Sequence, residues 1–522
     1  MSVITLLSLV LTARFVVFDF ENHVILRVLS PHGFIAQTLG IVCLFVILAS
    51  LLFVFRHIDD IDERKLFILT IGFSAVVGIV WVLCQPAARN TLDDSKWILQ
   101  YAQDAAAGRW ESFNRVPLIP YMPGVKPSAY QYFSWVPYQS SLFWYFYAFV
   151  KAFGLYAVPA MQLVNVAADV VTVWMVYRIT GGISQSKAVR CLALLLLAYL
   201  LPLHFFGRFL YGNDVGLALA LVFCALQVAA FQEDEVGKAY RRIALSLLPY
   251  SAMVVIKSTF VLMGIAAFIG WVLYGIYRKR FLGPLIALCV VIAGSFAGKV
   301  PTYALQRATG ENFGDGVPKA GWITVGLTTS YTMGNEPGWW DPEYTRIFAE
   351  MGGDAQEQTA ENKLRIEKRL CKFASDPVGA VQFFGMKTII EWCEPTYMSL
   401  YYSAIDDLVG GGRAFNSFAT PGWNLFARGV TYFLDGLQGL MYIGMSYELW
   451  RLFRTRRDEL PWGEVFLAIV LFVGMGCYLL WEAKSVYILP FVVLGLPLAA
   501  RGLKRILVTF TKNSGGGSPE RP

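Results

Sequence analysis

Apolar residues along this chain gather into long runs that are separated by short polar loops. A helix needs about 20 consecutive apolar residues to cross the hydrocarbon core of a bilayer. The runs that meet this length or come close to it are 33–55, 66–85, 157–178, 188–206, 212–231, 283–299, 427–449, 463–481 and 486–500. A further apolar stretch, 242–277, is interrupted by Lys257, so it predicts a helical hairpin with this lysine at its turn. Residues 1–20 are an additional candidate span.

This pattern predicts an all-α polytopic membrane protein with about eleven or twelve transmembrane helices. The composition agrees, because 56% of the 522 residues are hydrophobic and only 16% are charged. Mean hydropathy is +0.51. A soluble chain of this size could not bury so much apolar surface in its core. Lipid is therefore the expected solvent for most of the chain.

Basic residues predict which loops share a side of the membrane. They cluster in short loops between apolar runs, which is typical of cytoplasmic loops, and they form no long basic arm that would indicate nucleic-acid binding. The clusters are Arg56/Arg64/Lys65, Arg178/Lys187/Arg190, Lys238/Arg241/Arg242, Arg278/Lys279/Arg280, Arg451/Arg454/Arg456/Arg457 and Arg501/Lys504/Arg505. If all are cytoplasmic, two large loops, 86–156 and 300–426, face outside.

The spans and loops divide the chain into five parts. We expect additional N-terminal spans in 1–65, a seven-span unit in 66–299, the large outer loop 300–426, C-terminal spans in 427–505 and a disordered tail in 506–522. The aromatic segment 139–154 would break the alternation of sides if it spanned. It is therefore predicted to be a helix that lies in the outer membrane interface.

The eight cysteines form no CxxC or Cys/His pattern with metal-ligand spacing. Most lie in apolar runs, where cysteine behaves as a small hydrophobic residue. Cys371 and Cys393 differ because both lie in the largest polar region. A disulfide between them and two free thiols both stay open on the sequence alone.

The first outer loop contains the acidic pair Asp93 and Asp94 just beyond a span. Such residues often cap a helix or are simply solvated loop charges. The functional interpretation is a general base, because a sugar hydroxyl is a poor nucleophile until a carboxylate accepts its proton. We prefer Asp94 for this role, with Asp93 second.

Several stretches around this loop resemble the GT-C fold glycosyltransferases, and most closely the Gram-positive branch that decorates cell-wall polymers. The similarity runs from about Gln85 to Pro490 and preserves the order of its motifs. These motifs are Asp93-Asp94-Ser95, Tyr132-Phe-Ser-Trp-Val-Pro137-Tyr-Gln139, Ile256-Lys257-Ser258-Thr259, Val317-Pro318-Lys319-Ala-Gly-Trp322, Pro337-Gly338-Trp339-Trp340, Phe383-Phe384-Gly-Met-Lys387, Trp392-Cys-Glu-Pro395 and Trp481-Glu482-Ala-Lys484-Ser-Val-Tyr487.

The resemblance implies an inverting, hexosyltransferase-like enzyme of the cell membrane with an extracytoplasmic active site. It would move a sugar from a polyprenyl-phosphate carrier to a cell-wall polymer or a lipid-linked glycan. The absence of a Gly-rich phosphate loop fits a lipid-linked donor. No cofactor is firmly implied. Some GT-C enzymes use a divalent metal, but the sequence shows no dedicated ligand cluster.

Lys257 is the first candidate for binding the donor phosphate. A lysine between apolar stretches is costly and usually has a partner, and a cation stabilises the charge of a leaving phosphate. Lys257 could instead merely reach the headgroup level. Lys484, Arg208 and Tyr487 are further candidates for this site, although an interfacial tyrosine belt also explains Tyr487.

The remaining candidates would contact sugar. Aromatic faces pack against sugar rings, but aromatic residues also anchor loops to a bilayer. The predicted substrate-binding residues are Tyr132, Gln139, Trp322, Trp339, Trp340, Trp392 and Glu482. Asp214 could bind sugar hydroxyls or a metal, and it could equally cap the helix that begins beside it.

Two other classes of protein compete with the enzyme interpretation. A transporter or flippase of a lipid-linked sugar would carry ionisable residues deep in its spans and would show internal symmetry. Only Asp169 and Lys257 are prominent charges there, and no internal repeat is apparent. A structural scaffold of a wall-synthesis complex would tolerate the loss of Asp94.

Overall fold

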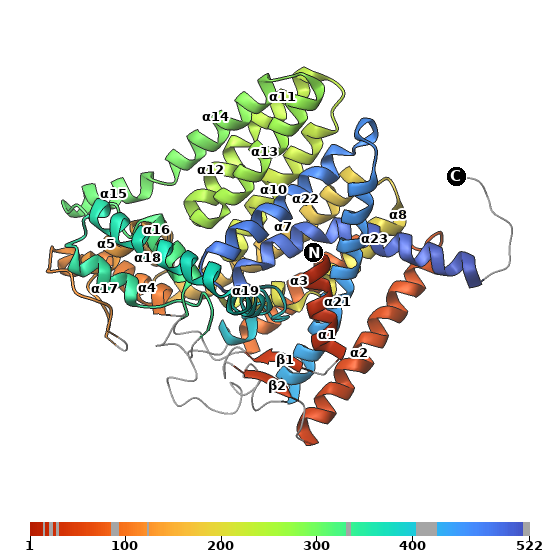
Figure 1. The fold of residues 1–522 in the computed structure, drawn as a ribbon, viewed down its shortest axis with the longest axis horizontal. Helices are drawn as coiled ribbons and strands as arrows, with labels where there is room; N and C mark the ends of the chain where they lie inside the picture. The colour runs from red at the N-terminus through yellow and green to blue at the C-terminus, as the bar shows by residue number, and fades with distance from the viewer. Residues whose placement is uncertain are drawn as a thin grey trace.

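The computed structural model describes residues 1–13, 16–19, 24–27, 31–84, 93–122, 125–329, 336–402 and 425–514. Within these residues the chain is a bundle of helices, with one antiparallel pair of short strands, β1 (Val16–Asp19) and β2 (Val24–Arg27). Figure 1 shows the bundle in the centre and a second group of helices at its left. The predicted all-α fold class is confirmed, with this hairpin as the exception.

Six segments of the described chain are long and apolar enough to cross a membrane. They are Glu63–Leu83, Pro137–Ile183, Asn213–Phe231, Ser258–Arg278, Leu282–Thr309 and Trp462–Leu480. A seventh candidate combines two helices, Lys187–Tyr199 and Leu201–Arg208, that meet at an angle of 51°. The protein is therefore a multi-pass membrane protein. The larger total of eleven or twelve spans stays a prediction.

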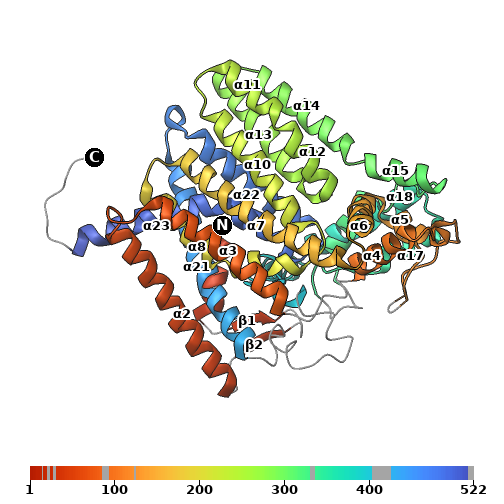
Figure 2. The ribbon, with the colours of Figure 1, turned by 180° about the vertical axis from the view of Figure 1, so that it is seen from behind.

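The bundle contains the helices at both ends of the sequence. They are α1 (Ser2–Ala13), α2 (Pro31–Arg56), α3 (Glu63–Cys84), α7 (Ala157–Ile183), α8 (Lys187–Tyr199), α9 (Leu201–Phe205), α10 (Asn213–Phe231), α11 (Val236–Leu245), α12 (Leu247–Ile256), α13 (Val261–Arg278), α14 (Leu282–Ala297), α21 (Leu425–Arg454), α22 (Trp462–Leu480) and α23 (Leu489–Ser514). Seen from behind, α3 and α7 cross the front of the bundle and α2 leans away from it (Figure 2). The predicted hairpin is confirmed as α12 and α13, with Lys257 between them. Helix α23 continues to Ser514, past the predicted start of the disordered tail at 506.

The second group of helices comes from the two predicted outer loops. They are α4 (Asp93–Ala106), α5 (Ala129–Trp135), α6 (Ser140–Phe153), α15 (Val300–Thr309), α16 (Lys319–Leu327), α17 (Glu343–Glu350), α18 (Ala355–Ser375) and α19 (Pro377–Trp392). Helix α4 has buried residues at helical spacing, Ile98, Tyr101, Ala102 and Ala105, so one face packs into the core of this group. Segment 139–154 does form a helix, α6, which packs beside α4. Its place at the lipid interface stays a prediction.

Ion pairs join the bundle helices at the opposite end of α22 from residues 481–487. The guanidinium group of Arg501 on α23 contacts the carboxylates of Glu464 on α22 and Glu448 on α21. It also donates to the carbonyl oxygen of Ile183 at 2.7 Å, where α7 ends. Arg451 joins the same two carboxylates, at 2.7 Å from Glu448 and 2.5 Å from Glu464. Residues from two predicted basic clusters thus meet the end of α7 at one end of the bundle.

Candidate functional site

A short turn between η4 (Phe206–Arg208) and α10 brings polar side chains to the end of the bundle that faces the second group of helices. Gly212 has a φ of +74°, which a residue with a side chain adopts only at a cost. A Cβ at this position would also lie 3.0 Å from Ile256 Cγ2 and 3.1 Å from the Ile256 carbonyl oxygen. Glycine therefore lets the turn lie directly against the end of α12, beside Lys257.

Lys257 connects α12 to η5 (Ser258–Phe260) and has an extended backbone, with φ −152° and ψ 111°. Its ammonium group donates to Asn213 Oδ1 and lies 4.2 Å from the centroid of the Tyr211 ring. Burial, followed by repulsion from Lys484, lowers the pKa of Lys257 to about 7. The group is therefore close to its titration point near neutral pH.

Asp94 lies in the first turn of α4 and reaches the same turn from the other side. Its Oδ2 accepts a hydrogen bond of 2.9 Å from the hydroxyl group of Tyr211. That hydroxyl oxygen in turn accepts a bond of 2.6 Å from Gln139 Nε2. The phenol of Tyr211 therefore lies between the proposed base and the proposed cation. The side chain of Asp93 lies outside the described residues.

Residues 481–487 contribute a second group of charges. Glu482 forms an ion pair of 2.5 Å with Lys484 and accepts a hydrogen bond of 3.2 Å from the hydroxyl of Tyr487. The Lys484 ammonium group lies 5.2 Å from the ring centroid of Trp339. The charges of Asp94, Glu482 and Lys484 all act on the pKa of Lys257. The structure thus brings side chains from four segments of the sequence into one electrostatic unit.

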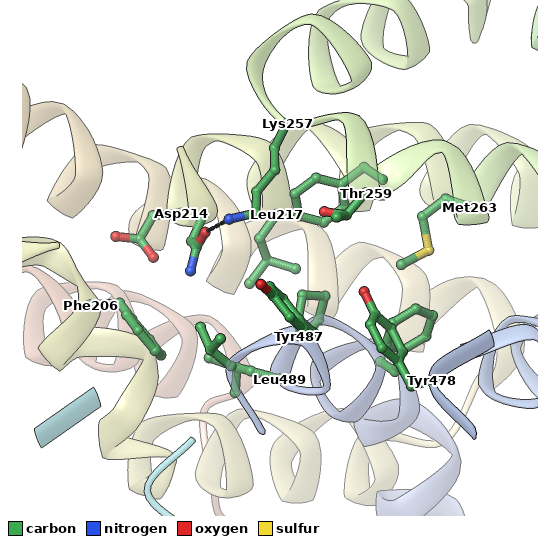
Figure 3. A pocket seen from close by; sticks show the side chains of 14 residues that line it. Phe206, Asp214, Leu217, Lys257, Thr259, Met263, Tyr478, Tyr487 and Leu489 are labelled. Carbon is green, nitrogen blue, oxygen red and sulfur yellow. Dashed lines mark hydrogen bonds between the residues drawn. The ribbon is translucent and has the colours of Figure 1, made fainter. Parts of the chain in front are cut away.

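A pocket opens beside this unit, and one of its walls is apolar (Figure 3). Its lining is Phe206, Asn213, Asp214, Leu217, Lys257, Thr259, Phe260, Met263, Tyr478, Val486, Tyr487, Leu489, Pro490 and Phe491. Lys257 reaches into it from the α12–α13 turn, and Tyr487 approaches from the opposite side. The cavity measures about 20 Å³, which is room for little more than one water molecule. A cation beside an apolar wall suits a group with a charged head and a hydrocarbon tail.

Asp214 also lines this pocket, in the first turn of α10. It is 2% exposed, and its Oδ2 has no hydrogen-bond partner among the described residues. The side chain turns away from Lys257 (Figure 3). Its proposed roles in binding sugar or a metal stay predictions.

Buried polar contacts hold residues 481–487 in place. The Lys387 ammonium group on α19 donates to the carbonyl oxygens of Gly326 at 2.6 Å and Trp481 at 2.5 Å. The amide of Ala483 donates to the Gly338 carbonyl oxygen at 2.7 Å. The Ser485 hydroxyl donates to Glu394 Oε2 at 2.6 Å. Three separate anchors therefore fix the segment that carries Glu482, Lys484 and Tyr487.

The predicted aromatic residues divide into two sets. Trp322 packs on Tyr344, with ring centroids 4.8 Å apart, and Trp340 Nε1 donates to the Tyr344 hydroxyl at 3.2 Å. Burial raises the pKa of Tyr344, and the negative charges of Asp94 and Glu482 add to this shift, so the aromatic group lies close to the site. Trp392 is 2% exposed in the bundle core, and its carbonyl oxygen accepts from Tyr442. Its contacts are those of a packing residue.

Two other predicted residues lie near the site without lining the pocket. Arg208 is 4% exposed in η4, and its carbonyl oxygen accepts from Gln162 Nε2 at 3.3 Å. Tyr132 is 2% exposed in the aromatic core around α4 and α5, where burial, followed by the Asp94 charge, raises its pKa. Both positions are compatible with a supporting role.

The sequence prediction assigned no role to Tyr211, Asn213 or Lys387. Tyr211 and Asn213 sit in Tyr211-Gly-Asn-Asp214, on the side predicted for Asp94, and this shared side was the available signal. Lys387 lies in Phe383-Phe384-Gly-Met-Lys387, where a lysine following apolar residues indicates a buried partner.

No group of three or more His, Cys, Asp or Glu side chains within the described ranges could hold a metal ion. Cys371 and Cys393 are both free thiols, the first exposed and the second buried. The structure therefore has no disulfide between Cys371 and Cys393.

No protein-family model matches the chain, and no curated protein matches it. Among solved structures, the chain is similar to the archaeal oligosaccharyltransferase AglB from Archaeoglobus fulgidus in complex with an inhibitory peptide and a dolichol-phosphate. The TM-score is 0.44 at 11% identity, over 88% of this chain and 53% of that one. A second structure, the Archaeoglobus fulgidus oligosaccharyltransferase in complex with Zn and sulfate, gives a TM-score of 0.39 at 14% identity, over 84% and 49%. The chain thus spans about half the length of these proteins, and at such TM-scores neither similarity decides its family.

Proposed function

We propose that the protein is a GT-C glycosyltransferase that moves a sugar from a polyprenyl-phosphate carrier to a glycan or cell-wall polymer at the outer face of the cell membrane. The arrangement of Asp94 and Lys257 on either side of Tyr211, beside a pocket with an apolar wall, supports this proposal most. The ordered motifs from Asp93 to Tyr487 support it independently.

The reaction requires one group that accepts the proton of the acceptor hydroxyl and another that stabilises the charge on the leaving phosphate. The acceptor hydroxyl oxygen attacks the anomeric carbon of the donor sugar, and its proton passes to the Asp94 carboxylate. The bond between the anomeric carbon and the phosphate oxygen breaks, and the phosphate leaves with the electron pair. Lys257 and Lys484 stabilise the charge that this phosphate gains.

The pocket suits the carrier for a separate reason. Lys257 supplies a cation, while Leu217, Phe260, Met263 and Leu489 supply an apolar wall for the first isoprene units. The aromatic group formed by Trp322, Trp340 and Tyr344 lies near Asp94, where the acceptor would bind. Aromatic faces there can pack against sugar rings.

The test is transfer of radiolabelled sugar from a panel of polyprenyl-phosphate sugars by the purified protein. We expect turnover by the wild type and a loss of about 10²- to 10⁴-fold in Asp94→Asn, because a general base contributes that much. Donor binding should be retained. Asp104→Asn is the matched control, because Asp104 lies on the same helix in an ion pair of 2.5 Å with the more exposed Arg109.

Two outcomes would contradict the proposal. Equal turnover by the wild type and Asp94→Asn would remove Asp94 as the base. Absence of turnover with every donor, together with movement of intact lipid-linked sugar across liposomes, would favour the transporter alternative.

A further inference from the structure

Tyr211 contacts both proposed reactive groups, Asp94 and Lys257. Its hydroxyl donates to Asp94 Oδ2 at 2.9 Å, and its ring lies 4.2 Å from the Lys257 ammonium group. These contacts use different parts of the side chain, the oxygen at the tip and the face of the ring. Each can therefore be removed separately.

The hydroxyl proton of Tyr211 has a defined direction. Gln139 Nε2 donates to the phenol oxygen at 2.6 Å, so the proton of the phenol is left to point to Asp94. Burial and the nearby Asp94 charge raise the pKa of Tyr211, which keeps the phenol neutral and able to donate. A donor fixed in this way holds the carboxylate in one orientation and favours its charged form.

The ring of Tyr211 holds Lys257 from the other side. A cation over an aromatic face is attracted by the negative face of the ring, more strongly when water is partly excluded. Asn213 Oδ1 accepts from the same ammonium group. The turn lies directly against Ile256 because Gly212 has no side chain. The Tyr211 ring, the Asn213 amide and Lys257 are therefore packed together at one junction.

We propose that Tyr211 is the positioning residue that sets the base and the donor-phosphate cation at a fixed separation. This inference rests on the proposed transfer reaction. The hydroxyl orients Asp94 for the acceptor, and the ring seats Lys257 for the donor phosphate. The acceptor side and the donor side of the site are thereby aligned through the side chain of Tyr211.

The experiment compares Tyr211→Phe with Tyr211→Leu in the purified full-length protein. Tyr211→Phe keeps the ring, so we expect an unchanged Kd for the donor and a kcat reduced about ten- to hundredfold, the effect of losing a hydrogen bond to a charged group. The acidic limb of the kcat/KM profile should move up by about one pH unit, because Asp94 loses a donor to its charged form. Tyr211→Leu should add a several-fold weaker donor Kd.

The control is Tyr177→Phe, which removes another bond between a phenol and a carboxylate. The Tyr177 hydroxyl donates to Glu63 at 2.5 Å, at the end of the bundle away from the site. We expect it to change neither the pH profile nor the donor Kd. In the Asp94→Asn background, Tyr211→Phe should cost nothing further, whereas a merely structural defect would persist there.

The inference fails if Tyr211→Phe keeps the wild-type kcat and acidic limb, or if Tyr211→Leu keeps the wild-type donor Kd. If Tyr211→Leu does not fold, the contact with Lys257 is tested with Tyr211→Met, which also lacks an aromatic face and should weaken the donor Kd several-fold. A wild type that is inactive with every donor would instead defeat the proposed function. The two failures are therefore distinguishable.

Discussion

The ammonium group of Lys387 donates to the carbonyl oxygen of Trp481 at 2.5 Å. This bond joins α19 to the residue that precedes Glu482, so a buried side chain on one element fixes the backbone of another. Burial lowers the pKa of Lys387 to about 8. The charges of Glu391 and Glu482 act against this shift, and the carbonyl oxygens of Trp481 and Gly326 accept from the ammonium group.

Lys387→Met should therefore weaken the site as well as the fold. It leaves two buried carbonyl oxygens without their donor, and we expect a loss of about 3 kcal/mol in the free energy of unfolding. Residues 481–487 should loosen, so the donor Kd should rise about tenfold. Thermal unfolding and donor binding measure the two effects. The exposed Lys372→Met is the control, and an unchanged donor Kd in Lys387→Met would argue against this anchoring role.

Donor binding should depend on pH through Lys257. Its pKa is about 7 without a ligand, and only the protonated form attracts phosphate. The phosphodiester of the donor keeps its single negative charge throughout this range. Affinity should therefore fall as pH rises through 7, by up to about tenfold per unit. Binding of labelled donor to Asp94→Asn between pH 6 and 9 measures this, with the fall beginning at a lower pH than 7 because the Asp94 charge, which raises the pKa of Lys257, is absent. Lys257→Arg should bind independently of pH, and a flat curve in the parent protein would exclude Lys257 as the cation.

Gly212→Ala should damage the junction between Tyr211 and Lys257. The positive φ and the close approach to Ile256 both oppose a side chain, so we expect about 1–2 kcal/mol of destabilisation and a weaker donor Kd. Gly108→Ala is the matched control, because Gly108 also has a positive φ, of 83°, but has open space around its Cβ position. It should share the conformational cost without the effect on donor binding. Equal donor Kd values in the two variants would contradict the proposed close packing.

Glu464→Gln should reduce stability without changing the chemistry. Glu464 is 2% exposed and contacts Arg451 and Arg501, so its neutralisation leaves two partly buried cations with less compensation. We expect a loss of about 3 kcal/mol in the free energy of unfolding, with an unchanged kcat per folded molecule. Thermal unfolding with active-site titration separates these quantities. A changed kcat would connect this end of the bundle to the reaction.

The sequence predicted the positions of charges better than their partners. Lys257 was predicted at a hairpin turn because a lysine interrupts an otherwise apolar stretch, and the structure places it there. Tyr211 could not be found in the same way, since a tyrosine at the end of a span is typical of any membrane interface. Its function depends on Asp94 and Lys257, which are 117 and 46 positions away in the chain.

Aromatic residues show a second limit of prediction from the sequence. Trp339 and Trp392 both lie in the predicted second outer loop. Both are buried in the same core, Trp339 at 4% and Trp392 at 2% exposed, but only Trp339 is seen to lie beside Lys484. Tertiary packing decides which buried tryptophan contacts the charged segment 481–487, and short motifs do not contain this information.

Ion pairs among Glu464, Arg451 and Arg501 join α21, α22 and α23 at one end of the bundle. Helices α22 and α23 also pack against each other further along, where Gly474 lies against Phe491, and residues 481–487 connect them beside a cavity of about 20 Å³. A lipid phosphate needs far more room than that. Binding of the proposed carrier therefore requires the side chains that line this cavity, Lys257 and Tyr487 among them, to move apart.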